Sequence, residues 1–410
     1  MSVIEKVVRA GLCTGCGLCE GIAGPERIRM QMSPPGYLRP QRLAVLPAGL
    51  EREIKAVCPG VSVQHEAGVP NYHPIWGPLQ STGVGYALDP EVRHIGSSGG
   101  VISALCIHLL ETGRVDFVAQ IAVSSDDPLR NDMQISRSRA DVLRSAGSRY
   151  APSAPLQSLH TLLATGERFA FVGKPCDVAA LRAYLRLKPE LNARIPVVLS
   201  FMCAGVPSLK GSHEVVDAMG GDVASLKHFR YRGDGWPGMA RAEQADGRVF
   251  EMDYNTSWGQ ILNRHLQFRC KVCADGTGEF ADLVCADAWH GKDGYPDFAE
   301  REGRSLILAR TDAGRALLAE ASQRQAIARE PLAVEHIAGM QPFQLSRKRL
   351  AAARALATLL ARGRSVYYRR MGLLQASRQE KLITILRNAW GTYRRAKGEP
   401  LPGNQMKAQN

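Results

Sequence analysis

The sequence predicts an α/β fold in four parts: a small cysteine-rich unit, two consecutive segments of a body of helices and strands, and a basic helical extension. Three observations lead to this prediction. Three cysteines are closely spaced near the start of the chain, short apolar runs alternate with helical patterns through its middle, and the excess positive charge lies near its end. At 410 residues the chain is long for a single core, so more than one domain is expected.

The first part, residues 1–65, is organised around four cysteines. Cys13, Cys16 and Cys19 are spaced C-x2-C-x2-C in LCTGCGLCEG, and Cys58 precedes Pro59 in AVCPG. Bacterial ferredoxins use a C-x2-C-x2-C-x3-C-P run, in which a tight loop wraps three thiolates around one side of a cluster. The segment is therefore interpreted as a ferredoxin-like unit that holds one [4Fe-4S] cluster. Zinc is the alternative, because four thiolates also suit that metal.

The second part, residues 66–200, has the alternation of an α/β domain. PNYHPIWGPLQ is read as a linker, and the apolar run that follows the turn IGSSGG predicts a helix that ends at Gly113. VDFVAQIAV predicts a strand, and HTLLATG followed by RFAFVGKPCDVAALRAYLR predicts helix, strand, loop and helix. This pattern implies a sheet that is covered by helices.

The third part, residues 201–345, completes a second set of four cysteines. Cys176 and Cys203 each follow an apolar run that predicts a buried strand, and FRCKVCAD contains Cys270 and Cys273. Thiolates at strand ends that face a cysteine-bearing loop suit a second [4Fe-4S] cluster. Cys285 is an alternative to Cys176 as the fourth ligand, although a packed core thiol is the simpler reading, and Cys106 is expected to be a core cysteine on a helix.

The fourth segment, residues 346–410, is predicted to be a basic helical tail. Between positions 346 and 398 it contains fourteen Lys and Arg and a single acid, Glu380, so it accounts for the whole net charge of +13. Apolar residues recur there at roughly helical spacing. Three readings stay open: an appendage that packs one face on the body, a docking surface for an acidic electron donor such as a ferredoxin, and an interfacial helix on anionic lipid. Nucleic-acid binding is not expected, because no recognition motif accompanies the charge.

Composition and the lack of long apolar runs indicate the cellular compartment in which the protein is expected. No apolar run is long enough to span a bilayer, and no hydrophobic signal region precedes the first cysteine. Ten cysteines without a secretion signal indicate metal ligation in a reducing compartment rather than disulfides, so a cytoplasmic protein is expected.

A flavin is the usual partner of such clusters, because clusters carry single electrons while most organic substrates need two. The turn Gly96-Ser97-Ser98-Gly99-Gly100 opens a helix, and its backbone N–H groups suit a phosphate. Arg144, Arg149 and Lys174 are nearby cations for a pyrophosphate. A plain helix cap and surface roles are the alternatives, and the chain has neither a G-x-G-x-x-G fingerprint nor a Walker A sequence.

Seven blocks of the chain resemble one family. In order, they are LCTGCGLCEG, SSGGVISALCIHLLETG, AGSRYAP, FVGKPCDVAALR, FMCAGVPS, RYRGDGWPG and FRCKVCADGTGEFADLVCADAW. Together they look like the coenzyme F-420 hydrogenase/dehydrogenase beta-subunit family, whose members include 7-hydroxymethyl chlorophyll a reductase and ferredoxin-dependent divinyl chlorophyllide reductase. The resemblance covers about residues 8 to 300. This chain departs from it in retaining one N-terminal cluster run and in carrying the basic extension.

The resemblance implies non-covalently bound FAD, iron–sulfur clusters and two-electron transfer to an organic acceptor. Carried over block by block, it implies that six residues lie near the flavin: Ser98, Gly99, Gly100, Ser148, Tyr150 and Lys174. It also implies that Cys176, Cys203, Cys270 and Cys273 ligate the second cluster.

The expected function is therefore an iron–sulfur flavoprotein oxidoreductase that passes electrons from a ferredoxin-like donor through two [4Fe-4S] clusters to FAD, and then as a hydride to a small organic substrate. Candidates for the proton donor, by position only, are Tyr150, Asp177, Asp287 and His290, each with a structural role as the simpler reading. Trp236, Trp258 and Trp289 are candidates for an aromatic pocket wall. The alternatives are use of the deazaflavin F-420, an electron-transfer subunit without its own substrate, and a zinc-stabilised binding module.

Overall fold

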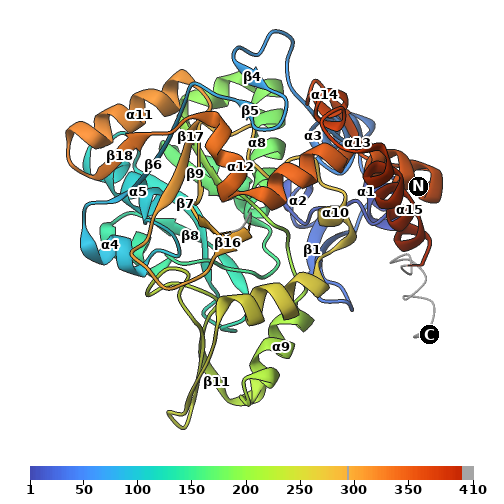
Figure 1. Cartoon of the computed structure of the whole chain (residues 1–410). Coiled ribbons are helices and arrows are strands. Elements are labelled where there is room, and N and C mark those ends of the chain that lie inside the picture. The colour runs from blue at the N-terminus through green and yellow to red at the C-terminus, as the bar shows by residue number, and fades with distance from the viewer. Residues whose placement is uncertain (293–294, 399–410) are drawn as a thin grey trace.

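The computed structural model describes residues 1–292 and 295–398, and its centre is a mixed sheet of eight strands (Figure 1). The strand order is β18-β6-β17-β14-β10-β9-β7-β8. The middle strands β14, β10, β9 and β7 are parallel, and the strands at both edges are antiparallel to their neighbours. Their bounds are β6 Ser81–Ala87, β7 Phe117–Val123, β8 Asn131–Ser136, β9 Phe169–Gly173, β10 Val197–Phe201, β14 Leu283–Asp287, β17 Ser305–Ala309 and β18 Ile327–Pro331. The α/β prediction is confirmed.

Strand β9 shows how the sheet divides two cores. Phe169 and Phe171 point into one core, whereas Ala170 and Val172 point into the other, as the two-residue period of a strand requires. The first core is covered by α7 (Leu159–Ala164) and α8 (Pro175–Leu187), and the second by α5 (Val101–Glu111), α6 (Arg139–Arg144) and α11 (Asp312–Gln323). Both faces are buried, which explains why these strands appear in the sequence as continuous apolar runs.

The sheet takes strands from both segments that were predicted as separate domains, 66–200 and 201–345. Strand β6 lies between β18 and β17, which come more than 200 residues later in the chain. Residues 70–80, predicted to be a linker, instead form the short hairpin of β4 (Tyr72–His73) and β5 (Gly77–Pro78). Ile75 and Trp76 of this hairpin are buried in the core. Burial of these apolar side chains explains why the segment packs against the body, although its prolines are typical of a linker.

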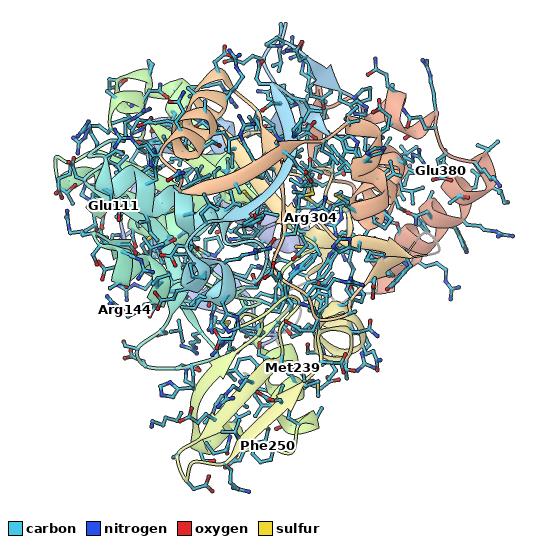
Figure 2. The ribbon with its side chains drawn as sticks, turned by 60° about the vertical axis from the view of Figure 1, so that its left-hand side comes forward. Glu111, Arg144, Met239, Phe250, Arg304 and Glu380 are labelled. Carbon is cyan, nitrogen blue, oxygen red and sulfur yellow. The ribbon has the colours of Figure 1, made fainter. Side chains whose placement is uncertain are left out.

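The N-terminal unit contains α1 (Val3–Arg9), α2 (Leu18–Ala23), the hairpin of β1 (Ile28–Met32) and β2 (Leu38–Arg42), α3 (Ala48–Val57) and β3 (Ser62–Gln64). It has its own small core, which includes Ile4, Ile28 and Ile54. A third sheet, of β11 (Leu226–Arg230), β12 (Ala240–Gln244) and β13 (Val249–Met252), packs with α9 (Leu209–Ala218) and projects from the body, where Figure 2 labels Met239 and Phe250.

The described part of the basic tail, up to residue 398, folds mainly as helices on the N-terminal side of the molecule (Figure 1). Helix α13 (Pro342–Arg362) is followed by β19 (Tyr367–Arg369), α14 (Leu373–Ser377) and α15 (Leu382–Gly398). Strand β19 pairs with β3 of the N-terminal unit, and α13 packs against α15. Glu380 lies at the edge opposite Glu111 in Figure 2. Among the residues described, no helix is both long and apolar enough to cross a membrane.

The remaining short elements connect these layers. They are α4 (Pro90–Ile95), η1 (Pro155–Ser158), η2 (Pro189–Ala193), η3 (Val223–Ser225), η4 (Asn255–Ile261), η5 (Leu262–His265), α10 (Phe268–Lys271), β15 (His290–Lys292), β16 (Tyr295–Asp297), η6 (Val334–His336) and α12 (Ile337–Met340). Helix α10 contains Cys270 and is followed by Cys273, so the second cysteine pair lies on a short turn rather than inside a long helix.

Candidate functional site

A cavity of about 670 Å³ lies at the carboxyl ends of the parallel strands. The ends of β9, β10 and β14 supply Gly173, Phe201 and Asp287 to its wall, and the segment after β10 adds Cys203. Ligands of open α/β sheets bind at this edge, because the strand-to-helix loops and the helix N-termini converge there. Its volume is within the range of small-molecule and cofactor sites.

The Ser/Gly turn forms one end of the cavity. Ser97, Ser98 and Gly100 line it, and the Ser97 and Ser148 hydroxyl oxygens are 2.6 Å apart. Gly100 is the N-cap residue of α5 in a left-handed conformation (φ 71°), so the first turn of the helix faces the cavity. Gly99, which was predicted to lie beside a ligand, is instead behind the cavity lining, where its N–H donates to Ser305 Oγ at 2.9 Å. Ser97 of the same turn lines the cavity.

Replacing Gly100 by Ala is expected to destabilise the protein by about 2 kcal/mol or more. The residue has a positive φ, and a Cβ atom would lie 2.5 Å from the carbonyl oxygen of Val92. Gly113 at the other end of α5 is the matched control, because it has φ 63° but nothing within 4 Å of its Cβ position. Gly113→Ala therefore measures the backbone strain alone. Thermal unfolding of both variants tests this, and equal losses would show that the close packing at Gly100 contributes nothing.

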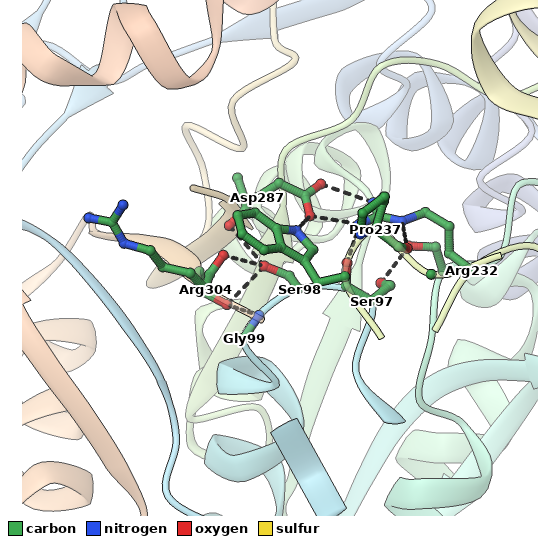
Figure 3. Close-up of polar contacts among 12 residues, drawn as sticks. Ser97, Ser98, Gly99, Arg232, Pro237, Asp287 and Arg304 are labelled. Atoms are coloured by element: carbon green, nitrogen blue, oxygen red, sulfur yellow. Dashed lines mark hydrogen bonds and ion pairs between the residues drawn. The ribbon is translucent and has the colours of Figure 1, made fainter. Parts of the chain in front are cut away.

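A buried ion pair fixes the centre of the wall (Figure 3). Arg232 is 1% exposed and donates to both carboxylate oxygens of Asp287, at 3.0 and 2.9 Å. It also donates to Pro237 O at 2.8 Å and to Ser97 O, while Trp236 Nε1 donates to Asp287 Oδ1 at 2.7 Å. These contacts tie the RYRGDGWPG segment to the Ser/Gly turn and to the end of β14. Burial disfavours the charge on Arg232, but Asp287 outweighs it and raises the arginine pKa.

Aromatic rings cover the side of the cavity. Tyr150 and Trp258 are in contact, with ring centroids 4.5 Å apart, and Tyr254 packs on Trp289 at 5.8 Å. All four rings line the cavity, as predicted for Trp258 and Trp289. Trp236 lies behind the wall, stacked on Trp289 at 4.8 Å, so it supports the wall instead of lining it.

The predicted cations lie in different surroundings. Lys174 is buried on the cavity wall, where Nζ lies 2.7 and 2.8 Å from the Asp177 carboxylate and donates to Ser153 O at 3.0 Å. Arg149 also lines the cavity, but its guanidinium is bound to Asn131 and to three backbone carbonyls. Arg144 instead pairs with Asp141 at the exposed surface and does not line the cavity. Of the three, Lys174 and Arg149 are therefore placed at the cavity.

The four candidates for a proton donor also separate. Tyr150, Asp177 and Asp287 line the cavity, although Asp177 and Asp287 are already held by ion pairs. Burial raises the pKa of Asp177 to about 6, even though Lys174 favours the ionised form. His290 is exposed and lies outside the lining, next to Trp236 with ring centroids 6.0 Å apart.

Cys13, Cys16, Cys19 and Cys58 come together within the N-terminal unit, in the segment between α1 and α2, at the start of α2 and at the end of α3. Burial, together with Asp177 and Cys13, raises the pKa of Cys16 to about 11. Burial and the nearby thiols Cys16 and Cys13 raise the pKa of Cys58 to about 12, and the same causes raise that of Cys19. These thiols affect one another because they share a small buried volume. Their thiolate forms therefore need a positively charged core among them.

Cys176, Cys203, Cys270 and Cys273 form the second group. Burial and the neighbouring Cys270 raise the pKa of Cys203 to about 12, and the pKa of Cys176 is raised by burial, with Cys203 and Cys270 among its neighbours. Val206 N donates to Cys270 Sγ at 3.3 Å. Cys203 also lines the cavity, so this set adjoins the cavity directly.

One side chain bridges the two groups of thiols. The amide of Gln267 is 3.3 Å from Thr14 O, between Cys13 and Cys16, and 3.4 Å from Cys270 Sγ. Lys174 and Asp177 flank Cys176 in the sequence. Burial disfavours the charge on Lys174, but Asp177 together with the thiols Cys176 and Cys16 outweighs it and raises the lysine pKa, so this pair is near both groups. The two cysteine sets and the cavity are therefore neighbours in space.

Cys106 and Cys285 belong to neither group. Cys285, on β14, also lines the cavity, and Cys106 is a residue of α5. Both are buried in the second core, and burial raises the pKa of each thiol. All ten cysteines are free. In the part of the chain that the structure describes, no three His, Cys, Asp or Glu side chains gather closely enough to hold a single metal ion. The ligands of a [4Fe-4S] cluster stand farther apart than those of a single ion, because each thiolate binds a different iron.

Sequence reasoning missed several residues that line the cavity. Arg232 and Tyr254 come from the projecting sheet and its exit, and Phe343, Gln344, Arg347 and Arg354 come from α13. Arg232 had a signal, because it lies within the specific block RYRGDGWPG. The α13 residues had none, since they lie outside the seven blocks and their place over the cavity depends on how that helix packs.

Comparisons with known proteins agree on one family. Residues 82–160 match the N-terminal domain, and residues 166–335 the C-terminal domain, of the family described as coenzyme F420 hydrogenase/dehydrogenase, beta subunit. The beta subunit of the coenzyme F420 hydrogenase from Methanococcus voltae is 26% identical over 57% of this chain and 77% of its own length. A subunit of the F(420)H(2) dehydrogenase from Methanosarcina mazei is 21% identical over 76% of this chain and 82% of its own length.

A third relative is the coenzyme F420-dependent sulfite reductase of Methanocaldococcus jannaschii, which is 26% identical over 53% of this chain and 34% of its own length. Among solved structures, a chain of the F420-reducing [NiFe] hydrogenase complex from Methanosarcina barkeri has a TM-score of 0.53 at 19% identity. The match covers 69% of this chain and 95% of that chain, so the two share a fold. The relatives named are all oxidoreductases or subunits of oxidoreductases.

Proposed function

Because the chain belongs to the coenzyme F420 hydrogenase/dehydrogenase beta-subunit family, we propose that it is an iron–sulfur flavoprotein oxidoreductase that works with a protein electron donor. One observation carries the proposal: two groups of four buried or half-buried cysteines lie next to each other, bridged by Gln267, and the second adjoins a cavity of cofactor size. Such an arrangement suits one-electron transfer through clusters held by these cysteines and a two-electron reaction in the cavity.

The donor sets fit [4Fe-4S] clusters. Cys13, Cys16, Cys19 and Cys58 would hold the first cluster, and Cys176, Cys203, Cys270 and Cys273 would hold the second. Buried thiols with raised pKa values need the positive charge that iron supplies, and Val206 N already donates to one of the sulfurs. Cys285 is the weaker candidate for the fourth position, because it is packed in the core near Cys106.

The cavity fits FAD. The first turn of α5, preceded by Ser97 and Ser98, offers backbone N–H groups for a pyrophosphate, and Tyr150, Trp258 and Trp289 offer faces for a planar ring. Lys174 is a buried cation on the same wall. Bound together, the clusters would supply one-electron transfer, and the flavin would convert single electrons into a hydride for an organic substrate.

The residues of the wall have definable tasks. The Arg232–Asp287 pair holds the Ser/Gly turn against the end of β14 and so fixes the shape of the cavity. Tyr150 is the preferred candidate for the proton donor, because Asp177 and Asp287 are held in ion pairs by Lys174 and Arg232. The aromatic side chains exclude water from the ring they would cover.

The tail is proposed to receive the electron donor. Its exposed cations lie on α15 and on the segment between α13 and α15, which packs beside the N-terminal unit: Arg364, Arg369, Arg370, Arg378, Lys381, Arg387, Arg394, Arg395 and Lys397. An acidic, ferredoxin-like protein would be attracted to this surface, and the attraction would speed encounter at low salt. The likeness to subunits of larger complexes supports a protein partner.

Anaerobic purification followed by iron, zinc and flavin assays tests the proposal. We expect about eight irons, as two four-iron clusters require, together with one FAD per chain and visible absorption that bleaches on reduction. A content of about four irons together with FAD would show that only one of the two clusters is present. A colourless, zinc-loaded protein without flavin would refute the proposal and leave a zinc-stabilised binding module.

A second candidate is that F420 itself is the two-electron partner. The names of two relatives, which belong to an F420 hydrogenase and an F(420)H(2) dehydrogenase, favour it. In that case reduced F420 would bleach the bound flavin directly in the absence of a protein donor. An unchanged flavin spectrum on mixing, with bleaching by a reduced ferredoxin, would favour the first candidate.

A further inference from the structure

Arg269 lies between the two cysteine sets and is 2% exposed. Its Nη2 donates to the carbonyl oxygen of Pro59 at 3.3 Å, directly after Cys58 of the first set. It directly precedes Cys270 of the second set, and its Cζ lies 5.8 Å from the ring centroid of Tyr368. Its Nε and Nη1 have no hydrogen-bond partner among the described residues. Buried donors without acceptors are costly, and charged ones more so, which indicates that an anionic group belongs beside this guanidinium.

Two further arginines approach the second set from α13. Arg347 donates to Cys203 O at 3.4 Å and to Ala204 O at 2.5 Å, and Arg354 donates to Lys271 O at 3.3 Å. Within residues 1–292 and 295–398, none of the three arginines forms an ion pair with a carboxylate. Burial, with Arg347 and Arg395, lowers the pKa of Arg354 to about 10, as expected for a cation without an anionic partner.

The first set has a different electrostatic environment. At the first set, Arg269 reaches Pro59 O, and Arg362 Nη1 donates to Ala10 O at 2.9 Å, three residues before Cys13. At the second set, Arg347 donates to the carbonyl oxygen of the proposed ligand Cys203, Arg354 donates to Lys271 O between Cys270 and Cys273, and Arg269 directly precedes Cys270. The second set therefore lies in the more positive surroundings of the two.

We propose that Arg269, Arg347 and Arg354 give the iron–sulfur centre at the second cysteine set a higher reduction potential than the centre at the first. This inference rests on the proposed function, because it presupposes a centre at each set. A centre that accepts one electron gains one negative charge, with no bond made or broken, and fixed cations in a low-dielectric interior stabilise the reduced form. The arginines thereby favour residence of the electron beside Cys203, at the wall of the cavity.

The test is an anaerobic redox titration of the holoprotein with dithionite, followed by EPR spectroscopy. In Arg269→Gln and in Arg347→Gln we expect one of the two midpoint potentials to fall. The electron-sharing equilibrium between the centres should shift on the order of tenfold, which is about 59 mV for one electron. Arg269→Lys retains the charge and should remain close to wild type. Arg315→Gln is the matched control, because it removes a cation that is 62% exposed and paired with Asp312.

The affected centre should be the one whose signal is lost in Cys273→Ser. Equal shifts of both potentials, no shift in either Gln variant, or the same shift in Arg269→Lys as in Arg269→Gln would overturn the inference. Loss of iron from both Gln variants would show that the arginines only build the site, and would overturn it as well. A wild-type protein without iron would instead refute the proposed function, so the two failures are distinguishable.

Discussion

Replacing Asp287 by Asn is expected to lower the free energy of unfolding by about 3 kcal/mol, because it leaves the guanidinium of Arg232 buried without a counter-charge. The substitution conserves shape and removes only the charge that Arg232 contacts at 3.0 and 2.9 Å. It also weakens the acceptor of Trp236 Nε1. The loss is large compared with the total stability of a typical domain, about 5–15 kcal/mol. Denaturant unfolding, followed by circular dichroism, measures it as a shift in midpoint.

Glu251→Gln provides the comparison for this measurement. It breaks the Arg241–Glu251 ion pair of the projecting sheet, whose two side chains are each 45% exposed, and should cost less than about 1 kcal/mol. The double variant Arg232→Met with Asp287→Asn should lose less than the two single losses combined, since neither charge is then left alone. An Asp287→Asn loss as small as that of Glu251→Gln would mean that the pair does not hold the wall.

Replacing Cys273 by Ser is expected to remove about four of about eight irons per chain, because one of the four ligands of the second cluster is lost. Electron delivery from a reduced donor to the flavin should fall to background, while flavin itself is retained, since Cys273 does not line the cavity. Iron content, flavin content and the rate of flavin reduction by a reduced ferredoxin test the three statements separately. Retention of all iron in this variant would contradict the assignment.

Cys285→Ala distinguishes the two candidates for the fourth ligand. Cys285 is 4% exposed and packs in the core near Cys106, so its loss should cost some stability and no iron. Cys176→Ser should lose iron as Cys273→Ser does. The reverse result, with iron lost only in Cys285→Ala, would transfer the fourth position to Cys285 and require a rearrangement of β14.

The resemblance and the local patterns predicted much of the fold. The helix expected after IGSSGG is α5, the apolar runs at 169–173 and 197–201 are the buried strands β9 and β10, and the family suggested by the seven blocks is confirmed. The linker expected at 70–80 was wrong, because Ile75 and Trp76 bury in the core there. Gly99 and His290 do not line the cavity, although their neighbours Ser98, Gly100 and Trp289 do.

Contacts within a few residues were determined by the sequence alone, because spacing along the chain sets which side chains share a loop or a face. The C-x2-C-x2-C run, the Gly100 cap and the Lys174–Asp177 pair are of this kind. Only the tertiary structure decided that Arg232 meets Asp287, 55 residues later, that Arg347 covers the Cys203 carbonyl and that Arg269 reaches Pro59. These contacts depend on strand order and on the packing of α13, and local periodicity carries no information about either.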